Sequence, residues 1–411
     1  MDSMVEAPGR NGSRRALGAV YAAGGISALG TQMTGLALPW LVLESTGSAT
    51  RAGLLFAVQV LPMALLGFAG GEVIQRLGAR RTMVVADAAR AVVIGLVPLL
   101  STMDALDFGV LLGIVVVAGV LGVPYFAAQR VLAADLAGSD PKALTRANSL
   151  LEGGFNIAAF VGPAVAGVLI ALVGAERVLW FDAASLMFSC LLLWRLVPRE
   201  EGRSQPAAHT AVLAGVRALR DDEFLRPAMV SSVTFGFLLR ILNIALPLLA
   251  FQRFGGDARV GGLLVAAFGA GALIGSFVSY LVASRVSPAR LMGMSVLQLV
   301  VPLWLLVAPA PVPVLVLALA VSAAALPMSN APFFAILATR FPDEIRAKVM
   351  QSVFTISSIA GPLGFLAGGV AIDRAGLTTT LLAVAALSSL AAVNLLRALR
   401  RLPAARKASV G

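Results

Sequence analysis

The stretch VPREEGRSQPAAHTAVLAGVRALRDDEF, residues 197–224, is the longest polar segment in a chain that otherwise consists mainly of apolar runs. It contains Pro198 and Pro206 and the densest group of charges in the sequence. On each side of it lie six mainly apolar runs of about 20 residues, the length that an α-helix needs to cross the hydrocarbon core of a membrane. The stretch therefore divides the chain into two sets of six predicted spans.

The composition supports a membrane protein. The 411 residues are 59% hydrophobic and 13% charged, whereas about a quarter of the residues of a soluble domain are charged. We predict an all-α integral membrane fold with 12 transmembrane helices in two pseudo-symmetric six-helix bundles around a central cavity. The predicted spans lie near residues 16–43, 50–75, 82–102, 108–128, 147–173, 177–197, 228–252, 260–283, 290–309, 312–338, 349–372 and 377–397.

The distribution of basic residues predicts the orientation. Of the 32 Lys and Arg residues, 25 lie on the side of the termini, two lie within spans, and five lie on the opposite side, namely Arg51, Arg177, Arg253, Arg259 and Arg374. Cytoplasmic loops carry the excess of basic residues, so both termini are expected in the cytoplasm of a cell whose plasma membrane holds the chain. The expected parts are an N-terminal tail (1–15), a first bundle (16–197), a cytoplasmic linker with an amphipathic helix (198–227), a second bundle (228–397) and a C-terminal tail (398–411).

The composition also excludes several function classes. The single cysteine, Cys190, lies in an apolar run and can form no internal disulfide, and the single histidine, His209, lies in the polar linker, so neither a His-based metal site nor a Ser/His/Asp relay is expected. The net charge of +11 is scattered in small groups between spans, which argues against nucleic acid binding. No GxxxxGK[ST] loop is present. We therefore expect no enzyme and no cofactor.

The two halves repeat each other. Residues 37–39 (Ala-Leu-Pro) recur as residues 245–247, and residues 51–53 (Arg-Ala-Gly) recur as 259–261 (Arg-Val-Gly), both at an offset of 208. The Gly-Pro pair at 162–163 has its echo at 361–362. Shared hydrophobicity alone does not preserve such spacings, and internal repeats are typical of transporters.

The segment GGEVIQRLGARR, residues 70–81, concentrates three glycines and three arginines between two spans. A phosphate-binding loop is one interpretation, but its position between spans favours a short cytoplasmic turn. In that interpretation Gly70, Gly71 and Gly78 allow the chain to fold back, and the arginines are topology anchors.

This segment resembles the signature loop of the major facilitator superfamily, Gly-x-x-x-Asp-Arg-x-Gly-Arg-Arg, with Gly71, Arg76, Gly78 and Arg80 at matching positions and Gln75 in place of the acidic residue. Further stretches are similar to the drug and siderophore exporter branch, which includes macrolide-efflux and enterobactin-exporter proteins: 39–55, 146–154, 162–167 and 180–186. The resemblance implies two bundles that rock around a cavity, with the loop residues in gating, and export driven by proton antiport. The fourth span lacks the Arg that many drug:proton antiporters carry there.

Arg240 is the strongest predicted substrate contact. It lies about 20 Å along the seventh span at 1.5 Å per residue, and a charge at that depth needs a role or a partner. At the repeat offset it corresponds to Gln32, and Asn243 and Thr34 extend the two polar patches. The alternative is a structural Arg paired with a carboxylate of another helix.

Three further charges lie within spans. Asp87 and Arg90 share a helical face and are expected to neutralise each other near the gating loop and to take part in gating with it. Asp182 is the predicted proton-coupling residue, although it could instead cap the sixth span or pair with Arg177. Four uncharged polar residues lie within spans, and for each of them a substrate contact and an interhelical hydrogen bond are both open: Gln59, Asn156, Gln298 and Asn330. Gln59, Asn156 and Asn330 are included in the predicted substrate site.

The sequence thus predicts a monomeric secondary active transporter that exports a small amphipathic compound, such as a drug, an antibiotic or a siderophore. Its expected partners are that substrate, protons and membrane lipid. Metabolite uptake or facilitated diffusion is the alternative within transport, and a membrane sensor or scaffold is the alternative outside it.

Overall fold

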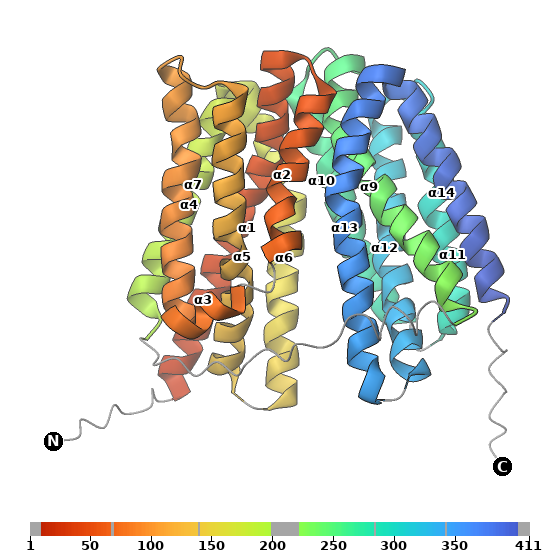
Figure 1. Ribbon diagram of the computed structural model, residues 1–411, viewed down its shortest axis with the longest axis horizontal. Coiled ribbons are helices and arrows are strands. Elements are labelled where there is room, and N and C mark those ends of the chain that lie inside the picture. The colour runs from red at the N-terminus through yellow and green to blue at the C-terminus, as the bar shows by residue number, and fades with distance from the viewer. Residues whose placement is uncertain are drawn as a thin grey trace. The chain divides into compact units, whose positions relative to one another are not determined.

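The computed structural model describes residues 10–66, 70–138, 140–198, 222–282, 285–341 and 343–401. These residues form two compact units. Unit 1 comprises residues 1–45 and 58–207, and unit 2 comprises residues 46–57 and 208–411. Figure 1 shows that each unit is built of long helices joined by short connections.

The helices of unit 1 are α1 (Arg10–Thr46), the second half of α2 (Ala49–Leu66), α3 (Gly70–Leu77), α4 (Ala79–Thr102), α5 (Phe108–Ala137), α6 (Pro141–Val173) and α7 (Ala175–Leu196). Unit 2 contains the first half of α2, α9 (Leu225–Arg253), α10 (Ala258–Val282), α11 (Pro288–Val300), the 3₁₀-helix η1 (Val301–Leu306), α12 (Val312–Arg340), α13 (Asp343–Ala375) and α14 (Leu377–Leu399). We call the end of a unit at which α1 or α9 begins its terminal end.

Eleven helices in the described residues are long and apolar enough to cross a membrane, and α13, with 33 residues, supplies the twelfth predicted span. The all-α membrane fold is therefore confirmed. Several helices extend beyond their predicted spans because their polar ends continue the helix: α5 runs on to Ala137, and α6 and α13 begin at Pro141 and Asp343. The ninth span changes to a 3₁₀-helix at Val301 because Pro302 has no backbone N–H for the α-helical ladder.

The predicted turn at residues 70–81 is wrong in its local structure. Residues 70–77 form the helix α3, in which Arg76 bonds Glu72 one turn away at 2.5 Å. Ile74 is buried in the core of unit 1, so an amphipathic pattern overrides the helix-breaking tendency of the first two glycines. Only Gly78, with φ 79°, adopts a backbone conformation that favours glycine.

Helix α2 is shared between the two units, and its first half is fastened to α13 within unit 2. The carboxylate of Asp373 accepts hydrogen bonds from the Ser48 hydroxyl (2.8 Å) and from the backbone N–H groups of Ala49 (2.9 Å) and Thr50 (2.8 Å). One turn further along α2, a Cβ on Gly53 would lie 2.6 Å from the carbonyl oxygen of Phe365. The contact between α2 and α13 thus combines a cap at the start of α2 with close packing of the two backbones.

Each unit has its own apolar core. Val20, Met83, Leu132 and Leu193 are among the buried residues of unit 1, and the core of unit 2 includes Leu225, Met292, Leu337 and Leu395. Residues 199–221 of the predicted linker, which include His209 and most of the predicted amphipathic helix, lie outside the described residues. The boundaries of the predicted parts remain predictions.

Candidate functional site

Among the buried charged residues of unit 1 are Asp87, Arg90 and Asp182, which we call the charge cluster. Their exposed fractions are 0%, 7% and 1%. Asp87 and Arg90 lie on α4, and Asp182 lies on α7. The predicted pairing is present, with Arg90 Nη1 at 3.8 Å from Asp87 Oδ1.

Hydroxyl groups of α1 connect the three charges. Thr34 donates to Asp182 Oδ2 at 2.6 Å, Thr31 accepts from Arg90 Nη2 at 3.0 Å, and Ser27 donates a long bond of 3.5 Å to Asp87 Oδ1. The spacing of these hydroxyls, four and then three residues, places them on one helical face. Thr34 is 2% exposed. Thr34 therefore faces the charge cluster, and its predicted role in substrate binding remains a prediction.

Helix α7 completes the surroundings of both carboxylates. Ser189 donates to Asp87 Oδ2 at 2.6 Å, and Ser185 lies 3.5 Å from Asp182 Oδ1. The two alternatives for Asp182 are not realised, because Gly174 occupies the N-cap of α7 and no described ion pair joins Asp182 to Arg177. Ser27 and Ser189 were not predicted as site residues, although the spacing of the hydroxyls on α1 could have indicated Ser27.

The net charge of the charge cluster depends on the protonation of its two carboxylates. Two carboxylates and one guanidinium carry a net charge of −1 when both acids are ionised, and the guanidinium does not lose its proton. A buried net charge is costly in a membrane interior. The cluster has no net charge when one of its two carboxylates is protonated.

A small cavity adjoins the cluster. Its volume is ≈ 40 Å³, and Arg90 and Tyr125 are in its wall. The Arg90 Nε and the Tyr125 hydroxyl are buried without a hydrogen-bond partner within the described residues. A water needs roughly 10–15 Å³ of such space, so the cavity is large enough for water to hydrogen-bond to both groups.

Gly30 lets α1 and α7 approach each other at the cluster. A Cβ at this position would collide with the Ser185 hydroxyl and would lie 2.5 Å from Asp182 Oδ1 and 3.1 Å from Asp182 Cα. The last contact is with backbone, which cannot rotate away. The side-chain geometry of Asp182 therefore depends on the absence of a side chain at Gly30.

We expect Gly30→Ala to destabilise the protein by about 1–3 kcal/mol, as overpacking of a tight contact does. The variant should therefore aggregate at a lower temperature in detergent, and size-exclusion chromatography after heating gives the midpoint temperature. Gly18→Ala is the matched control on the same helix, since nothing lies within 4 Å of a Cβ there. Equal midpoints for the two variants would contradict the predicted contact.

Arg240 is exposed on the middle of α9 in unit 2. Its guanidinium carbon lies 5.5 Å from the ring centroid of Phe365 on α13, a cation–π distance. Phe365 in turn stacks on Phe56 at 4.8 Å. No described carboxylate is within ion-pair distance of Arg240, so these residues provide no support for the alternative of a structural ion pair.

The repeat is visible in the packing around Arg240 and Gln32. A Cβ on Gly364 would lie 2.9 Å from Arg240 Cβ and 2.6 Å from the Phe237 carbonyl. In unit 1, a Cβ on Gly162 would lie 2.6 Å from Gln32 Cβ and would similarly approach the Leu29 carbonyl, at 3.2 Å. The structural equivalent of Gly162 is thus Gly364, one turn beyond the sequence echo at Gly361.

The other predicted contacts are scattered. Asn243 uses its amide to bond the carbonyl of Leu239 on its own helix, at 2.9 Å. Gln298 makes a structural bond to Val321 of α12, at 3.0 Å. Gln59 and Asn156 are half-buried on α2 and α6, and Asn330 is exposed on α12. The role of these residues in substrate binding remains a prediction.

The predicted gating residues of the loop lie at the terminal end of unit 1, whereas Asp87 and Arg90 belong to the charge cluster. Arg80 is 8% exposed and bonds the carbonyl of Trp194, in the last turn of α7, at 2.5 Å. Arg76 is exposed and bonds Glu72, and Gly71 lies inside α3. Arg80 thus fixes the start of α4 to α7, and a role of these residues in gating remains a prediction.

Comparisons with known proteins agree with this architecture. The profile of a major facilitator family described as transmembrane secretion effector matches residues 7–410. The chain is 30% identical over 374 residues to the multidrug efflux pump Tap of Mycolicibacterium fortuitum, covering 86% of this chain and 88% of that protein. It is 28% identical over 400 residues to Tap of Mycobacterium tuberculosis strain H37Rv, covering 94% of each.

Solved structures share the fold at low sequence identity. A mutant of the nucleoside transporter NupG matches with a TM-score of 0.78 at 13% identity, over 93% of this chain and 99% of that one. A bacterial homologue of the lysosomal transporter Spinster, inward-facing and unoccupied, matches with a TM-score of 0.70 at 14% identity, over 95% and 97%.

Proposed function

Because the chain belongs to the transmembrane secretion effector family of the major facilitator superfamily, we propose that it exports small amphipathic compounds in exchange for protons. Its relatives are named multidrug efflux pumps, which supports both the direction of transport and the class of substrate. They favour export over the alternative of metabolite uptake or facilitated diffusion.

The observation that supports proton exchange is that the charge cluster contains two carboxylates but only one arginine. Asp182 and Asp87 are buried with a single arginine between α1, α4 and α7. An exporter driven by protons needs a group that is neutral in one state and charged in the other. Asp182 is the better proton carrier, because Asp87 is the one within ion-pair distance of Arg90.

Helix α1 couples the proton site to the substrate. Thr31 and Thr34 face the cluster, while Gln32 packs on α6 at Gly162. Release of the proton from Asp182 leaves a carboxylate that holds Thr34 more strongly, because a charge-assisted hydrogen bond is the stronger one. A shift of α1 then moves Gln32, and the affinity for substrate changes with the protonation of Asp182.

Arg240 contributes the charged part of the substrate site. An exposed guanidinium without a described ion-pair partner attracts a carboxylate, a catecholate or a polarised carbonyl, and the neighbouring aromatic rings of Phe365 and Phe56 can contact apolar parts of the same compound.

The experiment that tests the function is reconstitution into liposomes with an imposed pH gradient. Dyes, macrolides and siderophores are screened for movement in either direction. Movement of at least one compound against its gradient, abolished by a protonophore, is the expected result. Movement only down the compound's own gradient would support facilitated diffusion instead.

We also propose that the terminal end of each unit faces the cytoplasm. In a Cys190→Ala background, a cysteine at Ser287, between α10 and α11, should be shielded from an impermeant thiol reagent added to intact cells. A cysteine at Ala105, between α4 and α5, should react. Both positions are exposed, so the reverse pattern of labelling would invert the orientation.

A further inference from the structure

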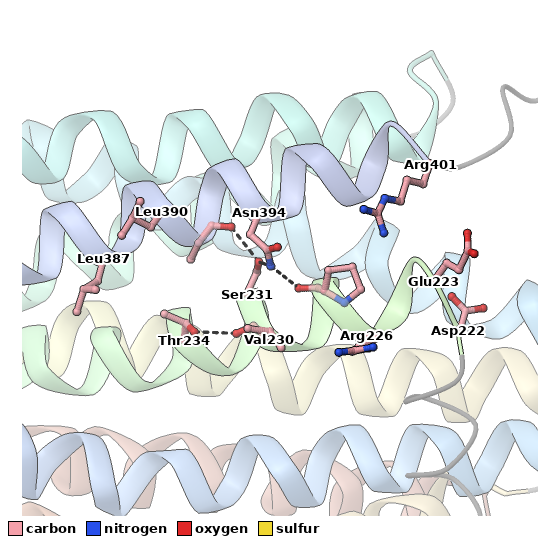
Figure 2. Close-up of a pocket in the computed structure, with 12 residues that line it drawn as sticks. Asp222, Glu223, Arg226, Val230, Ser231, Thr234, Leu387, Leu390, Asn394 and Arg401 are labelled. Atoms are coloured by element: carbon pink, nitrogen blue, oxygen red, sulfur yellow. Dashed lines mark hydrogen bonds between the residues drawn. The ribbon is translucent and has the colours of Figure 1, made fainter.

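A groove of ≈ 710 Å³ lies between α9 and α14 in unit 2. Figure 2 shows the two ends of this groove. Charged side chains gather at one end, where α9 begins and α14 finishes, and apolar side chains occupy the other. The charged end therefore lies at the expected membrane surface and the apolar end lies deeper.

Asp222, at the charged end of the groove, already has hydrogen-bond partners within the protein. Asp222 Oδ1 accepts hydrogen bonds from the backbone N–H groups of Phe224 and Leu225, each at 2.9 Å, and Oδ2 accepts from Arg340 Nε at 2.5 Å. Partial burial alone would raise the pKa of Asp222, but these hydrogen bonds outweigh it and hold the pKa below its usual value. Asp222 therefore binds two N–H groups where α9 begins and neutralises Arg340.

Arg226 and Arg401 are the two cations of the groove, and both are exposed. Neither has an ion-pair partner in the part of the chain that the structure describes. Glu223 lines the same end and is exposed. With Asp222 engaged by Arg340, the remaining side chains of this end carry two positive charges and one negative charge, so the groove entrance is net positive and favours an anionic group.

The floor of the groove is closed by internal hydrogen bonds. Asn394 donates through Nδ2 to the Pro227 carbonyl (2.9 Å) and to the Ser231 hydroxyl (3.0 Å), and Ser231 donates to the Ala391 carbonyl (2.9 Å). These donors are engaged within the protein and tie α9 to α14. Among the described lining residues, the polar groups of the floor are therefore already hydrogen-bonded within the protein. Only the charged side chains at the entrance are available to bind a ligand.

The deeper end presents apolar side chains to the outside. Val230, Leu387 and Leu390 are 59%, 47% and 66% exposed. In a helix that crosses a membrane, such side chains are in contact with lipid. The groove is therefore amphipathic along its length, with the same polarity as one leaflet of a bilayer.

We propose that this groove binds a membrane phospholipid, with the phosphate held by Arg226 and Arg401 and an acyl chain lying along Val230, Leu387 and Leu390. Basic pockets between transmembrane helices near a membrane surface bind lipid headgroups in this way, and the planar fork of arginine fits phosphate oxygens. A free phosphate ion would leave the apolar end unused. A cationic amphiphile would be repelled by the two arginines.

The test uses delipidated protein in detergent, titrated with dioleoyl-phosphatidylglycerol and followed by native mass spectrometry. We expect a one-lipid adduct with wild-type protein, and an affinity on the order of 30-fold lower for the Arg226→Gln, Arg401→Gln double variant. Dioleoylglycerol, which lacks the phosphate, should bind weakly to both proteins. Inorganic phosphate at the same concentration should not displace the phospholipid.

The matched control is Arg397→Gln, Arg400→Gln, which removes the same charge from exposed residues at the same end of α14, outside the groove lining. This variant should bind as the wild type does. Equal losses in both double variants would mean general surface attraction and would overturn the site, as would wild-type affinity in the groove variant. A steric test is Val230→Trp, which should lower binding, against Leu382→Trp, which lies on α14 outside the groove and should not.

Discussion

Asp182→Asn should reduce export driven by a pH gradient to the rate without a gradient, while the protein folds and still exchanges substrate. Asn has the same shape and can still accept the Thr34 hydrogen bond of 2.6 Å, but it cannot bind and release a proton. The remaining pair of Asp87 and Arg90 is neutral without a proton, so the variant is fixed in its uncharged form. Substrate counterflow and gradient-driven uptake into inverted vesicles measure the two activities separately.

Asp107→Asn is the control for this variant, because Asp107 caps α5 outside the membrane-spanning helices and Asn also caps helices well. It should transport as the wild type does. Asp87→Asn should behave differently from Asp182→Asn, since it leaves the buried Arg90 without its ion-pair partner, a loss of about 3–5 kcal/mol. Gradient-driven export at the wild-type rate in Asp182→Asn would remove Asp182 from proton coupling.

Arg240→Gln should abolish substrate binding and leave thermal stability near that of the wild type. No described carboxylate pairs with Arg240, so its removal leaves no buried charge without a partner. Arg240→Lys should bind with intermediate affinity, because it keeps the charge and loses the planar fork. Equilibrium binding of a transported dye to purified protein, together with a melting curve, gives both quantities.

Arg259→Gln provides the same change of charge at an exposed position on α10 and should bind substrate normally. Two results would contradict the assignment of Arg240. Wild-type affinity in folded Arg240→Gln would place the substrate elsewhere. A large loss of stability would show that the guanidinium has a structural role, through Phe365 and the neighbouring glycines of α13.

The spans could be predicted from the sequence because lipid requires long apolar helices, and that requirement is local in the chain. The Asp87–Arg90 pair could also be predicted, since a spacing of three residues on a helix places both side chains on one face. The partners of Asp182 could not, because Thr34 is 148 residues away and reaches it only through the packing of α1 against α7 at Gly30.

The error at residues 70–77 has a similar cause. Two adjacent glycines favour a turn, but the burial of Ile74 in the core of unit 1 depends on helices distant in the sequence. In the same way, Thr34 was grouped with Gln32 because the two are neighbours in the chain. They are two residues apart on a helix and therefore face different directions, one toward Asp182 and the other toward α6.

The cap of α2 has a consequence for biogenesis. The N–H of Ala49 and the Asp373 carboxylate that accepts from it are 324 residues apart. At a synthesis rate of about 5–20 residues per second, α2 is made roughly 15–65 seconds before its partner exists. During this interval the first half of α2 has neither the carboxylate nor the backbone of α13 against which Gly53 packs. The contact of α2 with α13 can therefore form only late in synthesis, after the rest of the chain up to Asp373 has been made.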